Sequence, residues 1–322
     1  MTEMIKLKGL TKQFGSITAV DMVDMTVESG EVLGFLGPNG AGKSTTMKMI
    51  AGFLEPTAGS ASVCGWDIQR DPVELKKILG YLPEGAPTYG DMTPQSYLRF
   101  IAAIRGFDGA ERQRRVDAMV DRIALREVLH QPIETLSKGF KRRVGLAQTM
   151  LHDPPVLIMD EPTDGLDPNQ KRHVRALIRE MAAEKAIVIS THILEEVEAV
   201  CTRAMIIARG RIRADARPEE LRSRAWNHNM VLITADAGDE ASLMEAIGGL
   251  PEVGTIDVTG RSGDTIRLRI QPAGGEQIGP RIGEFVRSRS LPVRELFIEQ
   301  GSLDEVFWSI TTEDGKQDGE HA

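Results

Sequence analysis

Cysteine is scarce in this chain, which has two cysteines among 322 residues. Cys64 and Cys201 lie in separate apolar stretches, and nothing around them has the spacing of zinc ligands. We therefore expect both thiols to pack as small hydrophobic side chains in a reducing cytosol, and neither a disulfide nor a metal site is predicted.

Long apolar runs are missing as well. No uninterrupted run approaches the roughly 20 residues that a helix needs to cross a bilayer. The first ten residues, MTEMIKLKGL, are polar and lack the apolar core of a signal peptide. We therefore expect no membrane span in this sequence.

An excess of positive charge is the third absence. The formal net charge is -8, which argues against a general nucleic-acid binder, because such proteins need basic surfaces. With 41% hydrophobic and 27% charged residues the composition is ordinary for a globular protein. The length of 322 residues is comfortable for two domains.

A glycine-rich stretch matches the phosphate-binding pattern G-x-x-x-x-G-K-[ST]. The nine residues are Gly37, Pro38, Asn39, Gly40, Ala41, Gly42, Lys43, Ser44 and Thr45. An apolar, strand-like run precedes them at residues 32–36, and residues 44–52 have helical spacing. In such a strand-turn-helix arrangement, backbone N–H groups and the positive end of the helix dipole point toward one place.

The residue types of this loop suit a nucleoside triphosphate. Glycines let the backbone wrap closely where a Cβ would collide. Lys43 can reach the β- and γ-phosphates, and the Ser44 hydroxyl is a suitable Mg²⁺ ligand.

Two carboxylates follow a second strand. Residues 156–159 are continuously apolar, which is typical of a buried strand in a parallel sheet, and Asp160 and Glu161 come next. Asp160 can bind Mg²⁺ directly or can hydrogen-bond one of its ligands. Glu161 can accept a proton from an attacking water, and general-base catalysis of this kind raises the reaction rate by about 10²–10⁴-fold. A solvated strand end is the alternative. His192 also ends a strand, at the sheet edge where ligands gather, and can bridge the γ-phosphate and Glu161, although a lone histidine is usually structural.

Other features leave alternatives open. Phe14 can stack on a flat base or simply pack. Glu84 ends the strand-like stretch Gly80–Pro83. Ser137 is expected to cap a helix that continues to Met150. Arg112, Arg114 and Arg115 lie on an amphipathic helix, where a solvated face is preferred to an anion site.

The pattern predicts two domains and a tail. Residues 1–224 read as an α/β nucleotide-binding domain with a first strand at residues 5–7 and with helices at about 86–150, among them residues 94–105 and 111–123. Residues 225–312 follow the order strand-helix-strand-strand-helix-strand of a ferredoxin-like unit, and a last helix starts at Ser302 with Glu305 completing a capping box. Residues 313–322 are polar and are expected to be disordered.

Residues 4–224 resemble the ATP-binding subunits of ABC transporters. The five matching motifs are Walker A (residues 37–45), Walker B (residues 156–160) with Glu161 as its catalytic acid, the signature LSKGF (residues 136–140), the D-loop (residues 165–168) and the switch histidine, His192. The implied fold is a P-loop NTPase nucleotide-binding domain with a helical subdomain, beside the ferredoxin-like α+β domain.

The resemblance implies a head-to-tail homodimer with ATP and Mg²⁺ between the two copies. Lys43, Glu161 and His192 would be catalytic, and Ser44, Glu84 and Asp160 would hold the metal. The Walker A residues would bind the nucleotide, and Phe14 would stack on its adenine. Ser137, Lys138 and Gly139 of the opposite copy would complete the site, and Asp167 would also belong to it.

The chain departs from the family pattern at two places. Glu84 stands where the family usually has glutamine, and a carboxylate can hold Mg²⁺ but cannot donate an amide hydrogen bond. Lys138 and Phe140 replace a glycine and a glutamine of the signature. Lys138 either adds positive charge near phosphate or faces water.

The segments GYLPE, LSKGF and Ser302–Phe307 resemble ABC-2 type exporters of the gliding-motility and multidrug types. That resemblance implies a separate integral-membrane permease, whose coupling helix would enter a groove between Glu84 and the helices of residues 94–123. It also implies a cytoplasmic protein held peripherally at the inner face of the cell membrane. The C-terminal domain would be regulatory or would stabilise the dimer, and no nucleic-acid partner is expected.

The sequence leaves two other functions as alternatives. A soluble ABC-type ATPase acting on ribosomes or DNA would commonly carry two cassettes or a coiled-coil insertion, and this chain has one P-loop and no sustained heptads. The second alternative is a module that binds nucleotide but has lost turnover. The presence of four residues suited to hydrolysis argues against it: Lys43, Asp160, Glu161 and His192.

Overall fold

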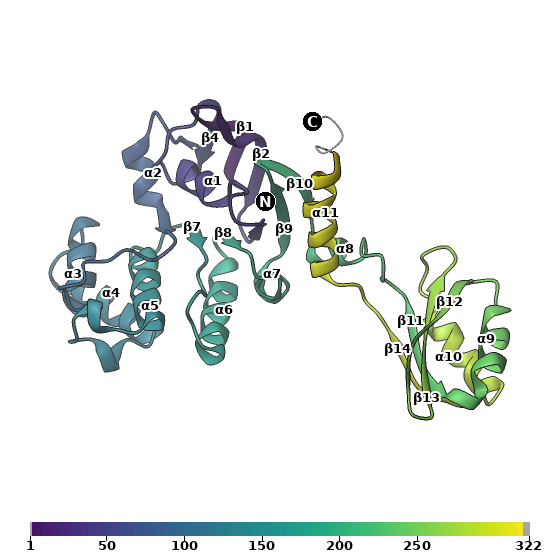
Figure 1. The fold of residues 1–322 in the computed structure, drawn as a ribbon. Helices are drawn as coiled ribbons and strands as arrows, with labels where there is room; N and C mark the ends of the chain where they lie inside the picture. The colour runs from purple at the N-terminus through teal and green to yellow at the C-terminus, as the bar shows by residue number, and fades with distance from the viewer. Residues whose placement is uncertain (1, 318–322) are drawn as a thin grey trace. The chain divides into compact units, whose positions relative to one another are not determined.

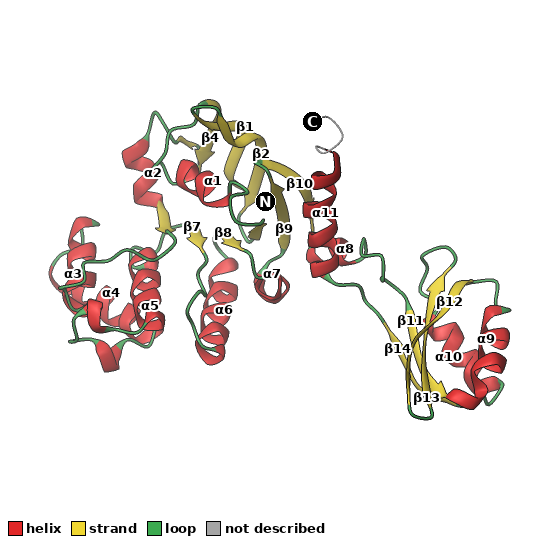
Figure 2. Cartoon of the chain, viewed as in Figure 1, coloured by secondary structure: helices red, strands yellow, loops and turns green. Residues whose placement is uncertain are grey.

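The computed structural model describes residues 2–317 and divides the chain after Pro218 into two compact units. Figure 1 follows the chain through both units, and Figure 2 shows their helices and strands. In the part of the chain that is described, no helix has the length and apolar character that crossing a bilayer requires.

The first unit contains two sheets and a set of helices. Its strands are β1 (Glu3–Phe14), β2 (Ile17–Glu28), β3 (Val32–Leu36), β4 (Ala58–Val63), β5 (Trp66–Asp67), β6 (Leu79–Leu82), β7 (Val156–Asp160), β8 (Ala186–Thr191), β9 (Arg203–Ala208) and β10 (Arg211–Ala216). Its helices are α1 (Lys43–Ile50), α2 (Pro72–Ile78), α3 (Pro94–Ile104), α4 (Gly109–Arg122), α5 (Lys138–Met150), α6 (Pro168–Ala182) and α7 (Leu194–Val200), with short 3-10 turns η1 (Arg126–Val128) and η2 (Ile133–Thr135).

The central sheet has six strands in the order β10-β9-β3-β8-β7-β6. All neighbouring strands are parallel except β10, which is antiparallel to β9. Every residue of β3, β7 and β8 is buried, because the sheet is covered on both faces. This confirms the parallel sheet predicted from the apolar run at residues 156–159. The carboxyl ends of β3, β7 and β8 therefore meet at one edge.

The two faces of this sheet contribute to different hydrophobic cores. Leu157 and Met159 belong to the core shared with α3–α6, whereas Val156 and Ile158 belong to the core shared with α1 and the second sheet. The alternation follows from the period of two in a strand. Both faces are thus closed by apolar packing, and only the strand ends remain for polar chemistry.

The second sheet of this unit is antiparallel, with the order β2-β1-β4-β5. The sequence predicted only Ile5–Leu7 as the first strand, but β1 continues to Phe14. The pattern failed because the pairing with β2 is irregular at several places and Gly9 has a positive φ of 56°. Register shifts of this kind break the alternation on which the sequence prediction relied.

Helices α3, α4 and α5 form one group beside the end of the sheet that carries β6, as Figure 1 shows. Thr93 caps α3 in a capping box with Ser96, and Ser137 caps α5 by accepting a hydrogen bond from the Phe140 amide over 3.3 Å. The predicted helices at 94–105 and 111–123 are confirmed to within two residues at each end. The predicted cap at Ser137 is confirmed as well.

The second unit has a ferredoxin-like fold, as predicted. Its elements are α8 (Pro218–Arg222), β11 (Val231–Asp236), the 3-10 turn η3 (Ala237–Asp239), α9 (Glu240–Gly248), β12 (Val253–Ser262), β13 (Thr265–Pro272), α10 (Gly279–Ser288), β14 (Val293–Ile298) and α11 (Leu303–Gln317). The antiparallel sheet has the order β12-β13-β11-β14, and α9 and α10 share its core through Leu243, Ile247, Ile282 and Val286.

The C-terminal helix differs from its prediction. The carboxylate of Glu305 does not complete a capping box; it accepts a hydrogen bond from the Trp226 indole over 2.9 Å. Ser302 instead accepts from the Asp304 amide over 3.0 Å. The helix continues to Gln317, so residues 313–317 are helical where a disordered tail was predicted, and the remaining tail, 318–322, lies outside the described residues.

Both cysteines are free thiols, and both are half-buried. Burial raises the pKa of Cys201 to about 12, with the charge of Glu196 adding to the effect. Burial also raises the pKa of Cys64. Neither thiol is therefore suited to be a nucleophile near neutral pH.

Candidate functional site

The glycine loop between β3 and α1 is wrapped so tightly that Gly37 and Gly42 leave no room for a side chain. A Cβ on Gly37 would lie 2.4 Å from the Ile207 carbonyl oxygen, and one on Gly42 would lie 2.5 Å from that of Ala19. Gly42 also has a φ of 109°, which L side chains rarely adopt. The loop therefore presents backbone N–H groups at the start of α1, which is the arrangement that binds phosphate.

Lys43 is nearly buried, with 7% of its surface exposed. Its ammonium donates hydrogen bonds to the carbonyls of Gly37 (2.7 Å) and Pro38 (3.2 Å), so the loop itself holds the cation. Burial lowers its pKa, and the negative charges of Glu161, Asp160 and Glu84 oppose that shift. The ammonium thus lies within electrostatic range of the carboxylates that the sequence placed in the same site.

Asp160 is the most buried carboxylate of this site, with 1% of its surface exposed. The register of β7 on β8 pairs it with Ser190, whose hydroxyl donates a hydrogen bond to Oδ1. Oδ2 is buried, and no hydrogen-bond partner for it lies within residues 2–317. A buried carboxylate oxygen without a partner is costly, and a cation is its natural ligand.

These observations fit Mg²⁺ brought with a nucleotide. Oxygen donors from Asp160 and Ser44 suit a hard cation, and the ion would take its remaining ligands from phosphate and water. Groups of three or more acidic, histidine or cysteine side chains suited to a metal are absent from the part of the chain that is described.

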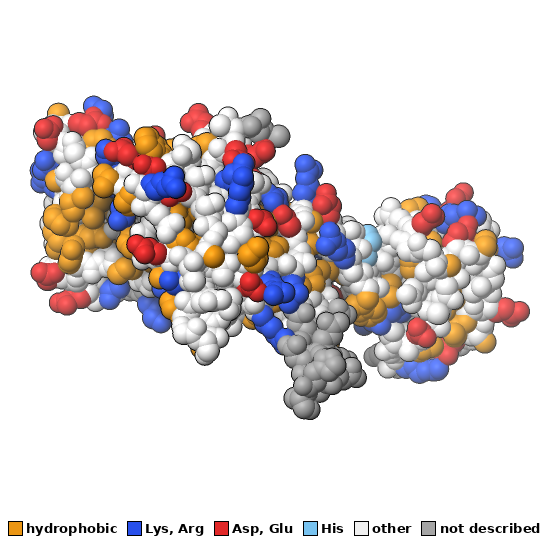
Figure 3. All heavy atoms as spheres, turned by 90° about the horizontal axis from the view of Figure 1, so that it is seen from above, with side chains coloured by type: hydrophobic (Ala, Val, Ile, Leu, Met, Phe, Trp, Pro, Cys, Tyr) orange, Lys and Arg blue, Asp and Glu red, His pale blue; other side chains and the backbone are white. Residues whose placement is uncertain are grey.

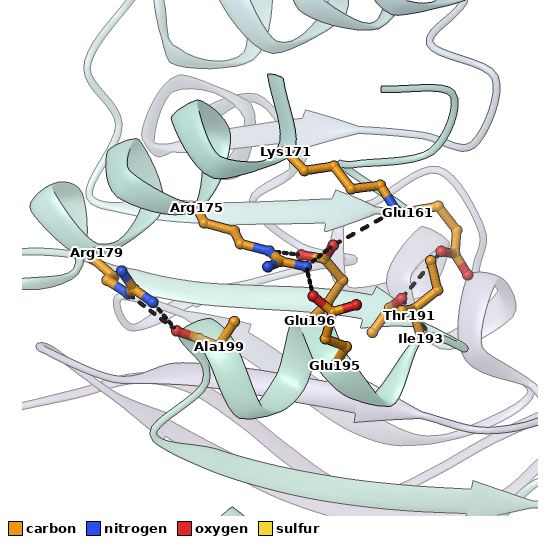
Figure 4. Close-up of polar contacts among 9 residues, drawn as sticks. All are labelled: Glu161, Lys171, Arg175, Arg179, Thr191, Ile193, Glu195, Glu196 and Ala199. Atoms are coloured by element: carbon orange, nitrogen blue, oxygen red, sulfur yellow. Dashed lines mark hydrogen bonds and ion pairs between the residues drawn. The ribbon is translucent and has the colours of Figure 1, made fainter. Parts of the chain in front are cut away.

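Glu161 adopts a left-handed conformation with a φ of 50°. Its amide donates to the Ser190 carbonyl over 3.0 Å, and its carboxylate accepts a hydrogen bond from Thr191 Oγ1 over 3.2 Å, which Figure 4 shows. Its other carboxylate oxygen lies 2.7 Å from Nδ1 of His192, whose side chain is 57% exposed. Strained backbone held by several partners is common at catalytic positions. The carboxylate is thereby fixed between a hydroxyl and an imidazole that faces solvent.

Arg142 is a residue that the sequence analysis missed. Its guanidinium lies on α5 and donates to the carbonyls of Pro83 and Asp160, each over 3.4 Å, and it lies 3.7 Å from a carboxylate oxygen of Asp164. It therefore joins the segment before Glu84, the end of β7 and the turn that follows. Only its position two residues after the signature stretch could have drawn attention to it.

Ser190 and Thr191 were also missed as polar partners of the carboxylates. The sequence showed them only as the end of a strand. Their roles depend on the pairing of β8 with β7, which brings two hydroxyls beside Asp160 and Glu161. Consecutive hydroxyl residues at the end of a buried strand were the available signal.

The signature residues make contacts elsewhere in the same chain. Ser137 and Lys138 are exposed, so Lys138 faces water in a single copy. A Cβ on Gly139 would lie 2.6 Å from Oε1 of Gln170, the end of a flexible side chain that can move away. Asp167 caps α6 by accepting from the Gln170 amide over 2.9 Å. Among the described residues, no hydrogen bond or ion pair joins these signature residues to Lys43 or Asp160.

Phe14 and Glu84 are both open to solvent. Phe14 is 49% exposed at the end of β1, and the Lys12 ammonium lies over its ring, 5.2 Å from the centroid. Glu84 is exposed in the turn after β6, and its charge acts on Lys43 and Arg142.

Comparison with known sequences places these features in context. The family model described as "ABC transporter" matches residues 20–164. The probable multidrug ABC transporter ATP-binding protein YbhF of Escherichia coli is 36% identical over 225 residues, which are 70% of this chain and 39% of that protein. The chain thus spans about two fifths of that relative's length.

Two further relatives are similar along almost their whole length. The linearmycin resistance ATP-binding protein LnrL of Bacillus subtilis is 30% identical, covering 96% of this chain and 98% of that protein. The daunorubicin/doxorubicin resistance ATP-binding protein DrrA of Streptomyces peucetius is 30% identical, covering 96% of this chain and 93% of that protein.

Solved structures share the fold of the first unit. An ATP-binding subunit of an ABC transporter is 32% identical with a TM-score of 0.64, covering 68% of this chain and 92% of that one. The dimeric ATP-binding cassette MJ0796 is 24% identical with a TM-score of 0.63, covering 67% of this chain and 99% of that one. The P-loop α/β fold is therefore shared with cassettes of this type.

Proposed function

The chain belongs to the ABC transporter family, and on that premise we propose that it is the ATP-binding and ATP-hydrolysing subunit of a transporter. The observation that carries the proposal is the pair formed by buried Asp160 and partly buried Glu161, which shares one sheet edge with the Lys43 loop. A binding module without turnover would not need a strained glutamate held by Thr191 and His192.

We propose that residues 37–45 hold the triphosphate, with Lys43 neutralising charge on its β- and γ-phosphates. Mg²⁺ bound by Ser44 and Asp160, with Glu84 as a further candidate ligand, would supply charge neutralisation between the phosphates. Glu161 would accept the proton of the attacking water, and His192 would hold that carboxylate in place.

We propose that two copies associate head to tail, with Ser137, Lys138 and Gly139 of one copy completing the nucleotide site of the other. The exposure of the Ser137–Lys138 turn at the start of α5 supports this proposal, because a free helix start can receive phosphate. Phe14 would stack on adenine, and Asp167 would lie at the same interface. Bound ATP would then hold the two copies together, and its hydrolysis would weaken the dimer interface.

We propose that the driven partner is a separate integral-membrane permease of the ABC-2 type, which would hold this subunit at the inner face of the membrane. Its docking surface would be the α3 face, defined by exposed Tyr89, Phe100 and Ile104 beside a surface pocket lined by Gln95, Ser96, Arg99, Phe100, Ala103 and Arg112. Figure 3 shows hydrophobic side chains gathered over this helical region. An exposed apolar patch of this kind is typical of a protein interface.

The relatives support export as the direction of transport. LnrL and DrrA are named for resistance to linearmycin and to daunorubicin and doxorubicin, and both match along nearly their full length. We therefore propose an exporter of drug-like molecules, with residues 1–224 as the motor and residues 225–312 as an accessory domain.

The first experiment measures phosphate release by the purified chain with Mg-ATP. We expect turnover in the wild type, and we expect Glu161→Gln to bind ATP but to lose turnover by about 10²-fold or more. The same variant should form an ATP-dependent dimer in gel filtration, because the interface is no longer broken by hydrolysis. Unchanged turnover in Glu161→Gln would remove this carboxylate from the mechanism.

The second experiment tests the phosphate loop with Lys43→Ala. We expect loss of ATP binding in equilibrium titration, because the cation that faces the phosphates is gone. Retained affinity and hydrolysis would contradict the assigned role.

Affinity purification in mild detergent, with Phe100→Asp as the comparison, would show whether a permease binds the α3 face.

A further inference from the structure

Helices α6 and α7 are joined by a bidentate ion pair between Arg175 and Glu196. Arg175 donates from Nε to one carboxylate oxygen over 2.9 Å and from Nη2 to the other over 2.7 Å. Nη2 also reaches the Glu195 carboxylate at 3.0 Å. Figure 4 shows the guanidinium of Arg175 lying between the two glutamates of α7.

This pair is removed from solvent. The side chain of Glu196 is 4% exposed and that of Arg175 is 18% exposed. Burying two charges costs hydration that their attraction often only balances, so such a pair is weak evidence for stability. A pair kept under these conditions suggests that it defines a specific arrangement.

Two more cations of α6 follow the same line along its axis. Lys171, one turn before Arg175, places its ammonium 4.0 Å from the Glu196 carboxylate. Arg179, one turn after it, donates to the Ala199 carbonyl near the end of α7 over 3.1 and 2.5 Å. Residues four apart share a helix face, so α7 is held against α6 along its length.

The two helices start from loops of the candidate site. Asp167 caps α6, and Thr191 and His192 directly precede α7. Thr191 Oγ1 accepts from the Ile193 amide over 3.0 Å and donates to Glu161, as Figure 4 shows. Thr191 is held by the sheet as the last residue of β8, whereas His192 lies between that strand and α7, so the position of α7 bears on where His192 lies.

We propose that Arg175 and Glu196 are positioning residues that fix α7 on α6 and thereby hold His192 against the Glu161 carboxylate. The inference rests on the proposed function for its catalytic consequence. The same pair ties α6, which follows the D-loop, to α7, which follows His192.

The test compares Arg175→Met and Glu196→Gln with the wild type at a temperature where all are folded. We expect kcat for Mg-ATP to fall by about 10-fold or more while KM stays within about twofold, because a misplaced catalytic group slows turnover without removing substrate contacts. Arg175→Lys should recover part of the loss. Arg122→Met is the matched control, because it breaks a more exposed ion pair that also involves α6, between Arg122 of α4 and Glu180 of α6.

A double variant separates positioning from general destabilisation. If the pair acts through His192, Arg175→Met should add little to the single-turnover defect of His192→Ala. Multiplicative losses would overturn the proposal, as would wild-type kcat in Arg175→Met.

Hydrogen exchange supplies a readout that does not need turnover. Arg175→Met should speed exchange of the amides at residues 191–196 in the nucleotide-free protein, and Arg122→Met should not. Unchanged exchange in that segment would overturn the positioning role. If the wild type lacked ATPase activity but this exchange difference appeared, the proposed function would be wrong, whereas the role of the Arg175–Glu196 pair as a clamp between α6 and α7 would still hold.

Discussion

The guanidinium of Arg142 donates a hydrogen bond to the main-chain carbonyl of Asp160 over 3.4 Å, from a side chain that is 4% exposed. The same guanidinium donates to the Pro83 carbonyl, so one cation on α5 joins two segments of the candidate site. Burial lowers its pKa, and the charges of Asp164, Glu161, Asp160 and Glu84 oppose the shift.

We predict that Arg142→Met lowers the free energy of unfolding by about 1–3 kcal/mol, because two carbonyls lose a charged donor. ATP hydrolysis should fall further than stability explains, since the end of β7 loses its anchor. Urea titration and phosphate release measure the two effects. Arg126→Met, which removes an exposed pair with Asp121, is the control and should change stability by less than about 0.5 kcal/mol. Equal effects of the two substitutions would contradict the prediction.

We predict that Gly37→Ala abolishes tight ATP binding. The added Cβ would meet the Ile207 carbonyl oxygen at 2.4 Å, so the loop must move away from β9. Overpacking of this kind costs about 1–3 kcal/mol of stability and displaces the backbone N–H groups that face phosphate. Isothermal titration with ATP and thermal unfolding are the measurements. Gly238→Ala, where nothing lies within 4 Å of the added carbon, should leave both unchanged.

We predict that the chain loses stability as the pH falls from about 6.5 to about 4, in part through His152. Burial lowers the pKa of this histidine to about 4, and the nearby Arg105 adds to the shift. The unfolded chain therefore binds a proton in this window that the folded chain excludes, so acid favours unfolding. The slope from one such group approaches about 1.4 kcal/mol per pH unit.

Urea unfolding at several pH values tests this assignment. His152→Gln should flatten the decline between pH 6.5 and 4, whereas His130→Gln, which removes an exposed imidazole, should not. Parallel curves for His152→Gln and the wild type would show that another group causes the acid sensitivity.

Much of the candidate site could be predicted because its signals are local. The phosphate loop lies within nine consecutive residues, and the apolar run at 156–159 predicted both a buried strand and the two carboxylates at its end. What could not be predicted is which side chains meet these carboxylates. Ser190 and Thr191 reach them only through strand register, and Arg142 reaches the main-chain carbonyl of Asp160 only through the packing of α5 on the sheet.

The sequence by itself determined the order of elements, the loop that only glycine can build, and the strand-helix order of the second unit, because each depends on the spacing of neighbouring residues. The tertiary structure alone decided the extent of β1, the Glu305 contact with Trp226 in place of a cap, and the Arg175–Glu196 clamp between α6 and α7. These features depend on partners far apart in the chain. Their energies arise only when packing brings the partners together, so no local pattern encodes them.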